Sequence, residues 1–380
     1  MNFMPNPVTT AKQQDRRFLD AAIRYARRNQ GRTGTNPSVA CVLVSHEEQG
    51  AIIIGRGVTA EGGRPHAEPI ALEEAGDAAK GATAYVTLEP CAHHGATPPC
   101  AQTLINAGVA RVVIAITDPD RRVNGLGRQM LEDAGVEVLD LHSGHAATRA
   151  MQGYLKARKF NRPFVTLKLA TTESGIIGSK SRGRVRITGA DLGRHVHLLR
   201  ARHDAILVGI GTILADDSDL RCRLPGLENR SPIRIVLDAS AKLTESHKIV
   251  KTAIESPTWV AGSNNASAEW RAMLQRNGVR FVACEISEGR IALPELMDDI
   301  AAGGIQSVMV EGGASVASGF LEQDLVDELV LSIGGAPETL EPGEKPVYSP
   351  VSVGKLPEGF VIAEDLRFGT DQYLRLIRND

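Results

Sequence analysis

The sequence predicts two α/β domains in one chain, and three observations lead to this fold class. The chain has 380 residues, which is too long for one ordinary hydrophobic core. Short β-branched runs alternate with segments of helical periodicity, a pattern typical of sheets covered by helices. A polar helical stretch separates two series of such elements. We therefore expect a first domain over residues 1–145, a linker over 146–163 and a second domain over 164–380.

The first domain is predicted to begin with an amphipathic helix and a hairpin. Apolar side chains recur with helical period over residues 15–28, and the β-branched runs at 38–44 and 50–58 are separated by a polar turn. Alternating helices and strands then predict an α/β sandwich that ends near residue 142. The expected order is helix 66–76, strand 82–90, helix 98–108, strand 110–119, helix 127–135 and strand 136–141.

The second domain is predicted to contain a longer series of the same kind. Its expected strands are 164–170, 204–210, 232–238, 258–262, 280–284, 307–313, 326–334 and 371–377. Its expected helices are 190–202, 268–278, 294–304 and 315–324.

Composition restricts the class of partner and the compartment. The formal charge of −2 is nearly balanced, so there is no electrostatic argument for nucleic acid or a membrane surface. Residues 1–12 lack the features of a secretory signal, and no apolar run approaches 18 residues. Five scattered cysteines fit reduced thiols better than a disulfide framework. We expect a cytoplasmic protein that acts on small molecules and whose thiolates can bind a metal.

Four residues of the types used by zinc enzymes lie within 35 positions: His66, Glu68, Cys91 and Cys100. One imidazole and two thiolates leave the fourth tetrahedral position for water, whereas a structural site normally closes that position. The metal lowers the pKa of the water toward neutrality. Glu68 can then stay unligated and carry a proton to a leaving amine.

Other interpretations of these residues compete with a catalytic site. His66 alone would more often be a hydrogen-bonded surface residue, and Cys91 and Cys100 alone would more often be small buried hydrophobes. His93 and His94 could also complete a structural Cys2His2 site. The joint arrangement favours the catalytic interpretation, because each ligand is expected at a helix start or a strand end.

The segments "HAE" and "EPC" fit the signature of zinc deaminases, although eight residues separate the cysteines where that signature has two. With this gap, "TNPSVACVLV", "GRPHAE" and "YVTLEPCAHHGATPPC" closely resemble the bifunctional riboflavin-biosynthesis deaminase/reductase family. The resemblance implies a cytidine-deaminase-like α/β/α sandwich that deaminates 2,5-diamino-6-(5-phosphoribosylamino)pyrimidin-4-one. It also implies that His66, Cys91 and Cys100 bind Zn²⁺, that Glu68 shuttles the proton, and that Asn36 helps to hold the pyrimidine.

The second half resembles the reductase of the same family through "LKLA", "ITG", "PIRIVLD" and "VEGGASVASGFLEQDLVDEL". No GxGxxG follows a strand, so a Rossmann site is not supported. The resemblance implies a dihydrofolate-reductase-like α/β domain that uses NADPH to reduce the ribosyl group of 5-amino-6-(5-phosphoribosylamino)uracil. It places Ala170, Thr188, Thr212, Asp216, Gly313, Ala314, Ser315, Val316, Ala317, Ser318 and Gly319 at the cofactor. It places Arg200, Leu220, Arg223 and Glu311 at the substrate.

The second domain departs from the family pattern in several places. Ser174 lies in "TESG" where the family typically has "SLDG", Arg186 replaces a Trp before "IT", and the loop "GGAPETLEPG" is altered. Arg182, Arg184 and Arg186 alternate and would share one face of an extended segment, as a phosphate site or as a solvated edge. One alternative is therefore a deaminase whose second domain is retained for dimerisation or substrate capture. A zinc-stabilised binding module is another. The resemblance favours a homodimer or larger homo-oligomer, and it leaves the choice between NADPH and NADH and any channelling open.

Overall fold

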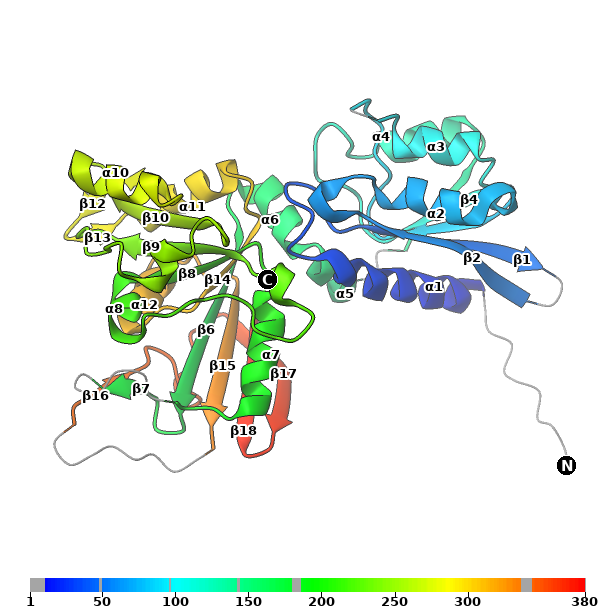
Figure 1. Cartoon of the computed structure of the whole chain (residues 1–380). Helices are drawn as coiled ribbons and strands as arrows, with labels where there is room; N and C mark the ends of the chain where they lie inside the picture. Colours follow the sequence, from blue (N-terminus) through cyan, green and yellow to red (C-terminus); the bar gives the residue numbers. More distant parts are fainter. Residues whose placement is uncertain are drawn as a thin grey trace, which may run out of the picture. The chain divides into compact units, whose positions relative to one another are not determined.

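The computed structural model describes residues 11–47, 50–95, 97–141, 144–179, 186–335 and 344–379 (Figure 1). The chain folds into two compact units, Met1–Phe160 and Asn161–Asp380. Arg182, Arg184 and the altered loop over 336–343 lie outside the described residues. Among the described residues, no helix is long and apolar enough to cross a membrane.

The first unit contains a five-stranded sheet in the order β2-β1-β3-β4-β5. Strand β1 runs antiparallel to β2 and β3, and β3, β4 and β5 are parallel to one another. The strands are β1 Ala40–Glu47, β2 Gly50–Val58, β3 Thr83–Val86, β4 Arg111–Ile114 and β5 Glu137–Asp140.

Helices cover both faces of this sheet, with α1 on one face and α2, α3 and α4 on the other (Figure 1). The helices are α1 Ala11–Ala26, α2 Ala67–Ala75, α3 Cys100–Asn106, α4 Leu126–Asp133, α5 Gly144–Ala150 and α6 Gln152–Phe160. Short 3-10 turns occupy Arg27–Asn29, Glu61–Gly63 and Gly76–Ala79. The result is the three-layer α/β/α sandwich expected for this part of the chain.

The segment expected to be a linker is mostly helical, because it contains α5 and α6. Ala147, Ala150, Met151 and Tyr154 are buried in the core of the first unit. Burial of these apolar side chains attaches the two helices to that core, so the division between the units falls after Phe160.

The second unit contains a nine-stranded sheet in the order β11-β10-β9-β8-β14-β6-β15-β18-β17. The strands from β11 to β15 are parallel, and β18 and β17 pair antiparallel at one edge. They are β6 Phe164–Thr172, β8 Ala205–Gly209, β9 Ile233–Asp238, β10 Thr258–Ser263, β11 Arg280–Cys284, β14 Ser307–Val310, β15 Glu328–Gly334, β17 Phe360–Phe368 and β18 Asp371–Arg378. The small pairs are β7 Ile176–Ser179 with β16 Pro346–Tyr348, and β12 Ile286–Ser287 with β13 Arg290–Ile291.

Alternate side chains of the parallel strands enter two separate cores. Leu207 of β8 joins a cluster with side chains from α11 and α12, whereas Ile206 and Val208 join a cluster with side chains from α8, α9 and α10. Helices therefore pack on both faces, as expected for buried parallel strands. The helices are α7 Ala190–Arg200, α8 Ile210–Asp216, α9 Lys248–Lys251, α10 Ala268–Arg276, α11 Leu293–Ala302 and α12 Ala314–Glu322, with a 3-10 turn at Glu228–Arg230.

Candidate active sites

The three predicted metal ligands converge in the first unit. His66 directly precedes α2, Cys100 is the first residue of α3, and Cys91 lies in the loop after β3. The ligand atoms of all three lie within 4.8 Å of one another. His66 Nδ1 is 3.3 Å from Cys100 Sγ and 3.8 Å from Cys91 Sγ. Tetrahedral zinc bonds place a nitrogen and a sulfur roughly 3.6 Å apart, so these residues fit zinc.

The environment of the cluster suits a metal with thiolate ligands. Hydrogen bonds from Cys100 and His66 lower the pKa of Cys91 to about 4, although burial opposes this. A metal cation deprotonates a coordinating thiol such as Cys100 outright. Among the described residues, no fourth Cys, His or carboxylate joins the group. His93 lines the adjoining pocket instead, and the arrangement therefore has the three ligands of a catalytic site.

Glu68 is buried beside the ligands without joining them. It lies in the first turn of α2, is 3% exposed and lines the same pocket as His66 and Cys91. Burial raises the pKa of Glu68 above the ordinary value of a carboxyl group. A carboxyl group with a raised pKa can hold a proton and release it again near neutral pH.

Close contact between α2 and β2 positions Glu68. A Cβ at Gly57 of β2 would lie 1.9 Å from the carbonyl oxygen of Ala67, and one at Gly55 would lie 2.2 Å from that of Ala71. Only glycine therefore lets the backbone of β2 touch the first turns of α2. The alanines of α2 face this contact, so the helix carries Glu68 directly over the sheet.

Asn36 lies in the pocket that contains the metal ligands. Its Nδ2 donates a hydrogen bond to the carbonyl oxygen of Gly63 at 3.2 Å. Gly63 has φ +90°, and a Cβ there would lie 2.4 Å from Asn36 Nδ2. The glycine thus provides the space in which the Asn36 amide is held. This pocket has a volume of about 80 Å³.

Glu89 orders one wall of the same pocket, and the sequence interpretation assigned it no role. The side chain is 4% exposed, and its carboxylate accepts hydrogen bonds from the backbone N–H groups of Asp118, Gly125, Gly127 and Arg128 at 3.0–3.2 Å. These bonds fix the loop between β4 and α4. Its position in "EPC" beside Cys91 was a signal for this role, but its partners come from another part of the chain.

The residues predicted for substrate and cofactor in the second domain line two neighbouring clefts, with the exception of Ala317 and Ser318. The first has a volume of about 870 Å³ and includes Arg200, Leu220, Arg223, Glu311, Ala170 and Thr188. The second has a volume of about 830 Å³ and includes Ala314, Ser315, Val316 and Gly319. Thr212, Asp216 and Gly313 line both. The clefts lie at the carboxyl ends of β6, β8, β9 and β14, where ligands of open parallel sheets bind.

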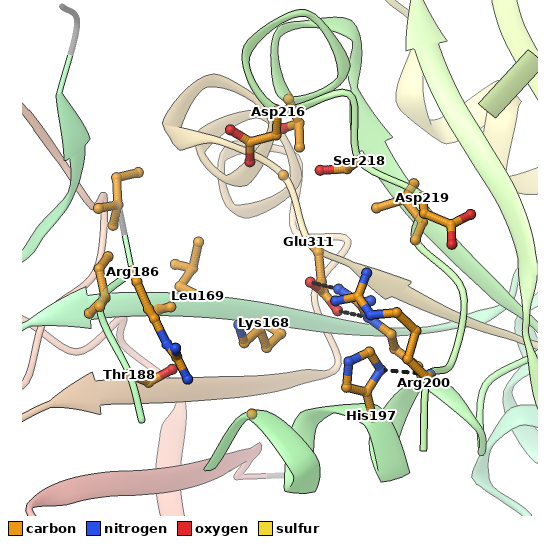
Figure 2. Close-up of a pocket in the computed structure, with 18 of the residues that line it drawn as sticks. Lys168, Leu169, Arg186, Thr188, His197, Arg200, Asp216, Ser218, Asp219 and Glu311 are labelled. Atoms are coloured by element: carbon orange, nitrogen blue, oxygen red, sulfur yellow. Dashed lines mark hydrogen bonds and ion pairs between the residues drawn. The ribbon is translucent and has the colours of Figure 1, made fainter. Parts of the chain in front are cut away.

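Arg200 and Glu311 form a bidentate ion pair in the first cleft (Figure 2). Arg200 Nε and Nη2 each donate to one oxygen of Glu311 at 2.8 Å. Burial opposes ionisation of Glu311, but the Arg200 guanidinium outweighs it and lowers the pKa of Glu311 to about 2. The guanidinium fork of Arg200 is therefore engaged by a carboxylate, and Arg223, which is exposed, is the more available cation for an anionic ligand.

Lys168 and His197 also line this cleft, and the sequence interpretation missed both as site residues. Figure 2 shows them beside Glu311 and Arg200. Burial, together with Arg200 and Arg223, lowers the pKa of His197 to about 4, so its imidazole is neutral near pH 7. Lys168 could have been found from the sequence, because it interrupts an otherwise apolar strand. His197 gave no comparable signal.

The predicted phosphate-binding run, Gly313 to Gly319, is divided by the start of α12. Gly313 is the residue before the helix, and Ala314, Ser315 and Val316 form its first turn. The N–H of Ala317 already donates to the carbonyl oxygen of Gly313 at 3.1 Å, and its side chain is buried in the core. Only the N–H groups of the first turn can therefore face a ligand. Ala317 and Ser318 do not line either cleft.

Arg186 is the only one of the three alternating arginines that lies in the described chain. It lines the first cleft next to Thr188, at the opposite end from Arg200 (Figure 2). Leu220 lines the same cleft in a left-handed backbone conformation, with φ 61°. Such a conformation costs a β-carbon-bearing residue on the order of 1–3 kcal/mol and is enriched at ligand sites.

The fold and the sites define a two-domain enzyme in which a zinc deaminase is joined to an α/β domain with large ligand clefts. Residues 12–116 match the cytidine and deoxycytidylate deaminase zinc-binding region, and residues 163–343 match the RibD C-terminal domain. Riboflavin biosynthesis protein RibD of Escherichia coli is 37% identical over 377 residues, which cover 96% of this chain and 99% of that protein. The protein of the same name from Haemophilus influenzae is 39% identical, covering 86% of this chain and 87% of the relative.

Solved structures agree with this relationship. A structure of Acinetobacter baumannii RibD is 33% identical and superposes with a TM-score of 0.83, covering 97% of this chain and 100% of that one. A deaminase/reductase from Thermotoga maritima is 27% identical with a TM-score of 0.82 and the same coverage. The chain belongs to the RibD family of riboflavin-biosynthesis proteins. The predicted fold class, and the prediction of an enzyme with deaminase and reductase activities that uses zinc and NADPH, are confirmed.

Proposed function

We propose that the first domain hydrolyses the ring amine of 2,5-diamino-6-(5-phosphoribosylamino)pyrimidin-4-one. The second domain then reduces the ribosyl group of the product, 5-amino-6-(5-phosphoribosylamino)uracil. The observation that carries the first step is the cluster of His66, Cys91 and Cys100 with the buried Glu68 beside it. The related Thermotoga maritima protein is named as a deaminase and reductase of these compounds.

In the deamination, His66, Cys91 and Cys100 would hold zinc, which supplies an activated water for attack on the ring carbon. Glu68 takes a proton from that water and delivers it to the amine, which leaves as ammonia. Asn36 holds the ring at the pocket wall. The raised pKa of Glu68 suits this role, because a carboxyl that is easily protonated can serve as acid and base in turn.

In the reduction, NADPH supplies a hydride to the sugar carbon, so the protein needs no nucleophile and acts by positioning the reactants. The cofactor would lie across Ala170, Thr188, Thr212 and Asp216, with its phosphates at the first turn of α12. The substrate would lie beside Leu220, Arg223 and the Arg200–Glu311 pair. The shared lining of the two clefts by Thr212, Asp216 and Gly313 supports this, because a cofactor in one cleft would then lie next to a substrate in the other.

Three further assignments belong to the same proposal. The deaminase occupies residues 1–145 and the reductase 164–380. The protein works in the cytoplasm on small phosphoribosylated pyrimidines. It assembles as a homodimer or larger homo-oligomer, for which the exposed Val361, Ile362 and Leu366 on the edge strand β17 offer an apolar surface. Sedimentation of the purified chain measures the last of these.

The deaminase assignment is tested with Glu68→Gln. The purified protein should hold about one zinc per chain and release ammonia from the diaminopyrimidine. Glu68→Gln should lower the rate of ammonia release roughly 10²- to 10⁴-fold while zinc content stays unchanged, because Glu68 is not a ligand. Glu73→Gln, on the exposed side of the same helix, is the control and should behave as wild type. Loss of zinc together with activity in Glu68→Gln would favour a structural role instead.

A further inference from the structure

The mouth of the deaminase pocket holds three arginines, Arg64, Arg122 and Arg158. Two of them, Arg122 and Arg158, contact the same carboxylate, that of Asp120. Arg122 donates to Asp120 from Nε at 3.0 Å and from Nη2 at 2.6 Å, and Arg158 Nε lies 3.6 Å from Asp120 Oδ2. Asp120 therefore engages both side chains, and its negative charge offsets part of their combined positive charge.

The pocket's acidic residues are likewise committed to partners other than Arg64. Glu89 accepts four backbone N–H groups, and Asp118 accepts the hydroxyl of Tyr154 at 2.9 Å. Glu68 lies beside the metal ligands. Within the described chain, Arg64 makes no ion pair, and its side-chain partner is the hydroxyl of Thr97, to which Nη1 donates at 2.8 Å.

Arg64 is also held in place against the loop that connects the two cysteine ligands. Thr97 belongs to this loop, and so does Gly95, where a Cβ would lie 3.1 Å from Arg64 Nη2. The guanidinium thus rests on the loop while most of its five N–H donors remain unused by the protein. A fixed guanidinium with unused donors loses little side-chain entropy when it binds an anion.

We propose that Arg64 binds the phosphate of the phosphoribosyl group while the pyrimidine ring occupies the zinc pocket. This assignment rests on the proposed deaminase function and goes beyond it, because it names the residue that selects phosphorylated substrates. The whole pocket is small, at about 80 Å³, so the phosphoribosyl group must extend out of it past the arginines. A phosphate dianion there meets a planar fork of donors that matches its oxygens.

The test compares phosphorylated and dephosphorylated substrate in steady-state ammonia release by the full-length zinc enzyme. Arg64→Gln should raise KM for the phosphoribosyl substrate about 10- to 100-fold, the effect of losing a charge-assisted hydrogen bond, with kcat and zinc content nearly unchanged. The KM of Arg64→Lys should lie between those of wild type and Arg64→Gln, because a lysine keeps the positive charge but lacks the planar fork of donors. With the ribosyl substrate that lacks phosphate, wild type and Arg64→Gln should have the same kcat/KM. Inorganic phosphate should inhibit wild type competitively and Arg64→Gln much less.

Arg56→Gln is the matched control, since Arg56 is an exposed arginine on β2 that pairs with Glu74 and lies outside the pocket lining. It should show wild-type discrimination between the two substrates. An equal loss of kcat/KM on both substrates in Arg64→Gln would mean that Arg64 only braces the loop, and it would overturn the assignment. An unchanged KM would overturn it as well, with the deaminase function intact. A wild-type enzyme that releases no ammonia would instead overturn the proposed function on which it rests.

Discussion

Single charged residues in the second unit are buried in specific ion-pair and hydrogen-bond networks. Arg234 is fully buried and donates to carbonyl oxygens of Ile249, Thr252 and Ser256 and to the hydroxyl of Thr258. Burial lowers the pKa of Arg234 to about 10, so the side chain keeps its charge at neutral pH. These hydrogen bonds connect β9 to the segment around α9. A buried charge of this kind specifies structure, in contrast to Arg64, whose donors face a pocket.

The Arg200–Glu311 pair makes the stability of the second unit depend on pH. The pKa of Glu311 is about 2 in the folded protein, against 4.5 as its ordinary value. A lowered folded pKa stabilises the fold above pH 4.5, and this contribution is lost as the pH falls from 4.5 toward 2. Glu311→Gln should therefore lower the free energy of unfolding by about 3 kcal/mol at pH 7, and the difference from wild type should shrink across that acidic range.

Urea unfolding followed by tryptophan fluorescence measures this effect in the second unit alone. The chain has two tryptophans, Trp259 and Trp270, and both lie in that unit. The control is Glu295→Gln, which removes an exposed glutamate of α11 and should match wild type at every pH. A difference between Glu311→Gln and wild type that stays constant from pH 7 to pH 3 would contradict the lowered pKa.

At the scale of elements, the zinc pocket depends on the hydrogen bonds that hold the loop between β4 and α4 in place. The Glu89 carboxylate accepts hydrogen bonds from two backbone N–H groups of this loop and from two in the first turn of α4. A Cβ at Gly127 would lie 1.9 Å from the carbonyl oxygen of Pro90. The start of α4 therefore touches the backbone beside Cys91. Asp118 and Asp120 belong to the same loop, so Glu89 indirectly positions the pocket wall opposite the ligands.

Glu89→Gln should loosen this loop without removing the metal. A Gln amide offers one acceptor oxygen, so the NH₂ group would face backbone donors, and we expect a loss of about 1–3 kcal/mol in the stability of the first unit. Hydrogen exchange of the N–H groups of 125–128 should speed up, and KM for the deaminase substrate should rise at unchanged zinc content. Glu132→Gln, which removes an exposed carboxylate from α4, is the control. If the N–H groups of 125–128 exchange as slowly in Glu89→Gln as in wild type, then Glu89 does not hold this loop in place.

The sequence predicted most elements, and the omissions have physical causes. Helix α8 follows β8 directly and buries a single side chain, Ile213, so it displays no apolar stripe of helical period. Strand β17 lies at the sheet edge, where Val361 and Ile362 are exposed and charged residues follow. Its side chains therefore do not alternate between apolar and polar. The helical stretch expected as a linker packs on the first unit instead, because its apolar residues find a core that the sequence alone does not display.

At the scale of the whole molecule, two units with separate hydrophobic cores hold two separate sites. The residues of the two sites have no interaction partner in common, so substitutions in one site should not change the activity of the other. Glu68→Gln should keep NADPH oxidation with the deaminated intermediate, and Glu311→Gln should keep ammonia release. Both reactions are assayed separately on one preparation of each full-length variant. No NADPH turnover by folded wild-type protein would favour a degenerate second domain, and a joint loss in either variant would contradict independence.

The sequence alone determined the fold class, the zinc chemistry and the family, because these depend on residue types at fixed spacings. The "HAE" and "EPCAHHGATPPC" segments contain the metal ligands and the proton carrier. Only the tertiary structure decided the role of Glu89, the place of His197 in the first cleft and the pairing of Arg200 with Glu311. It likewise separated Arg64, whose side chain donates to a hydroxyl, from the two arginines that contact Asp120. The physical reason is that an ionisable side chain acquires its function from its partners and its burial, and residues far apart in the chain provide both.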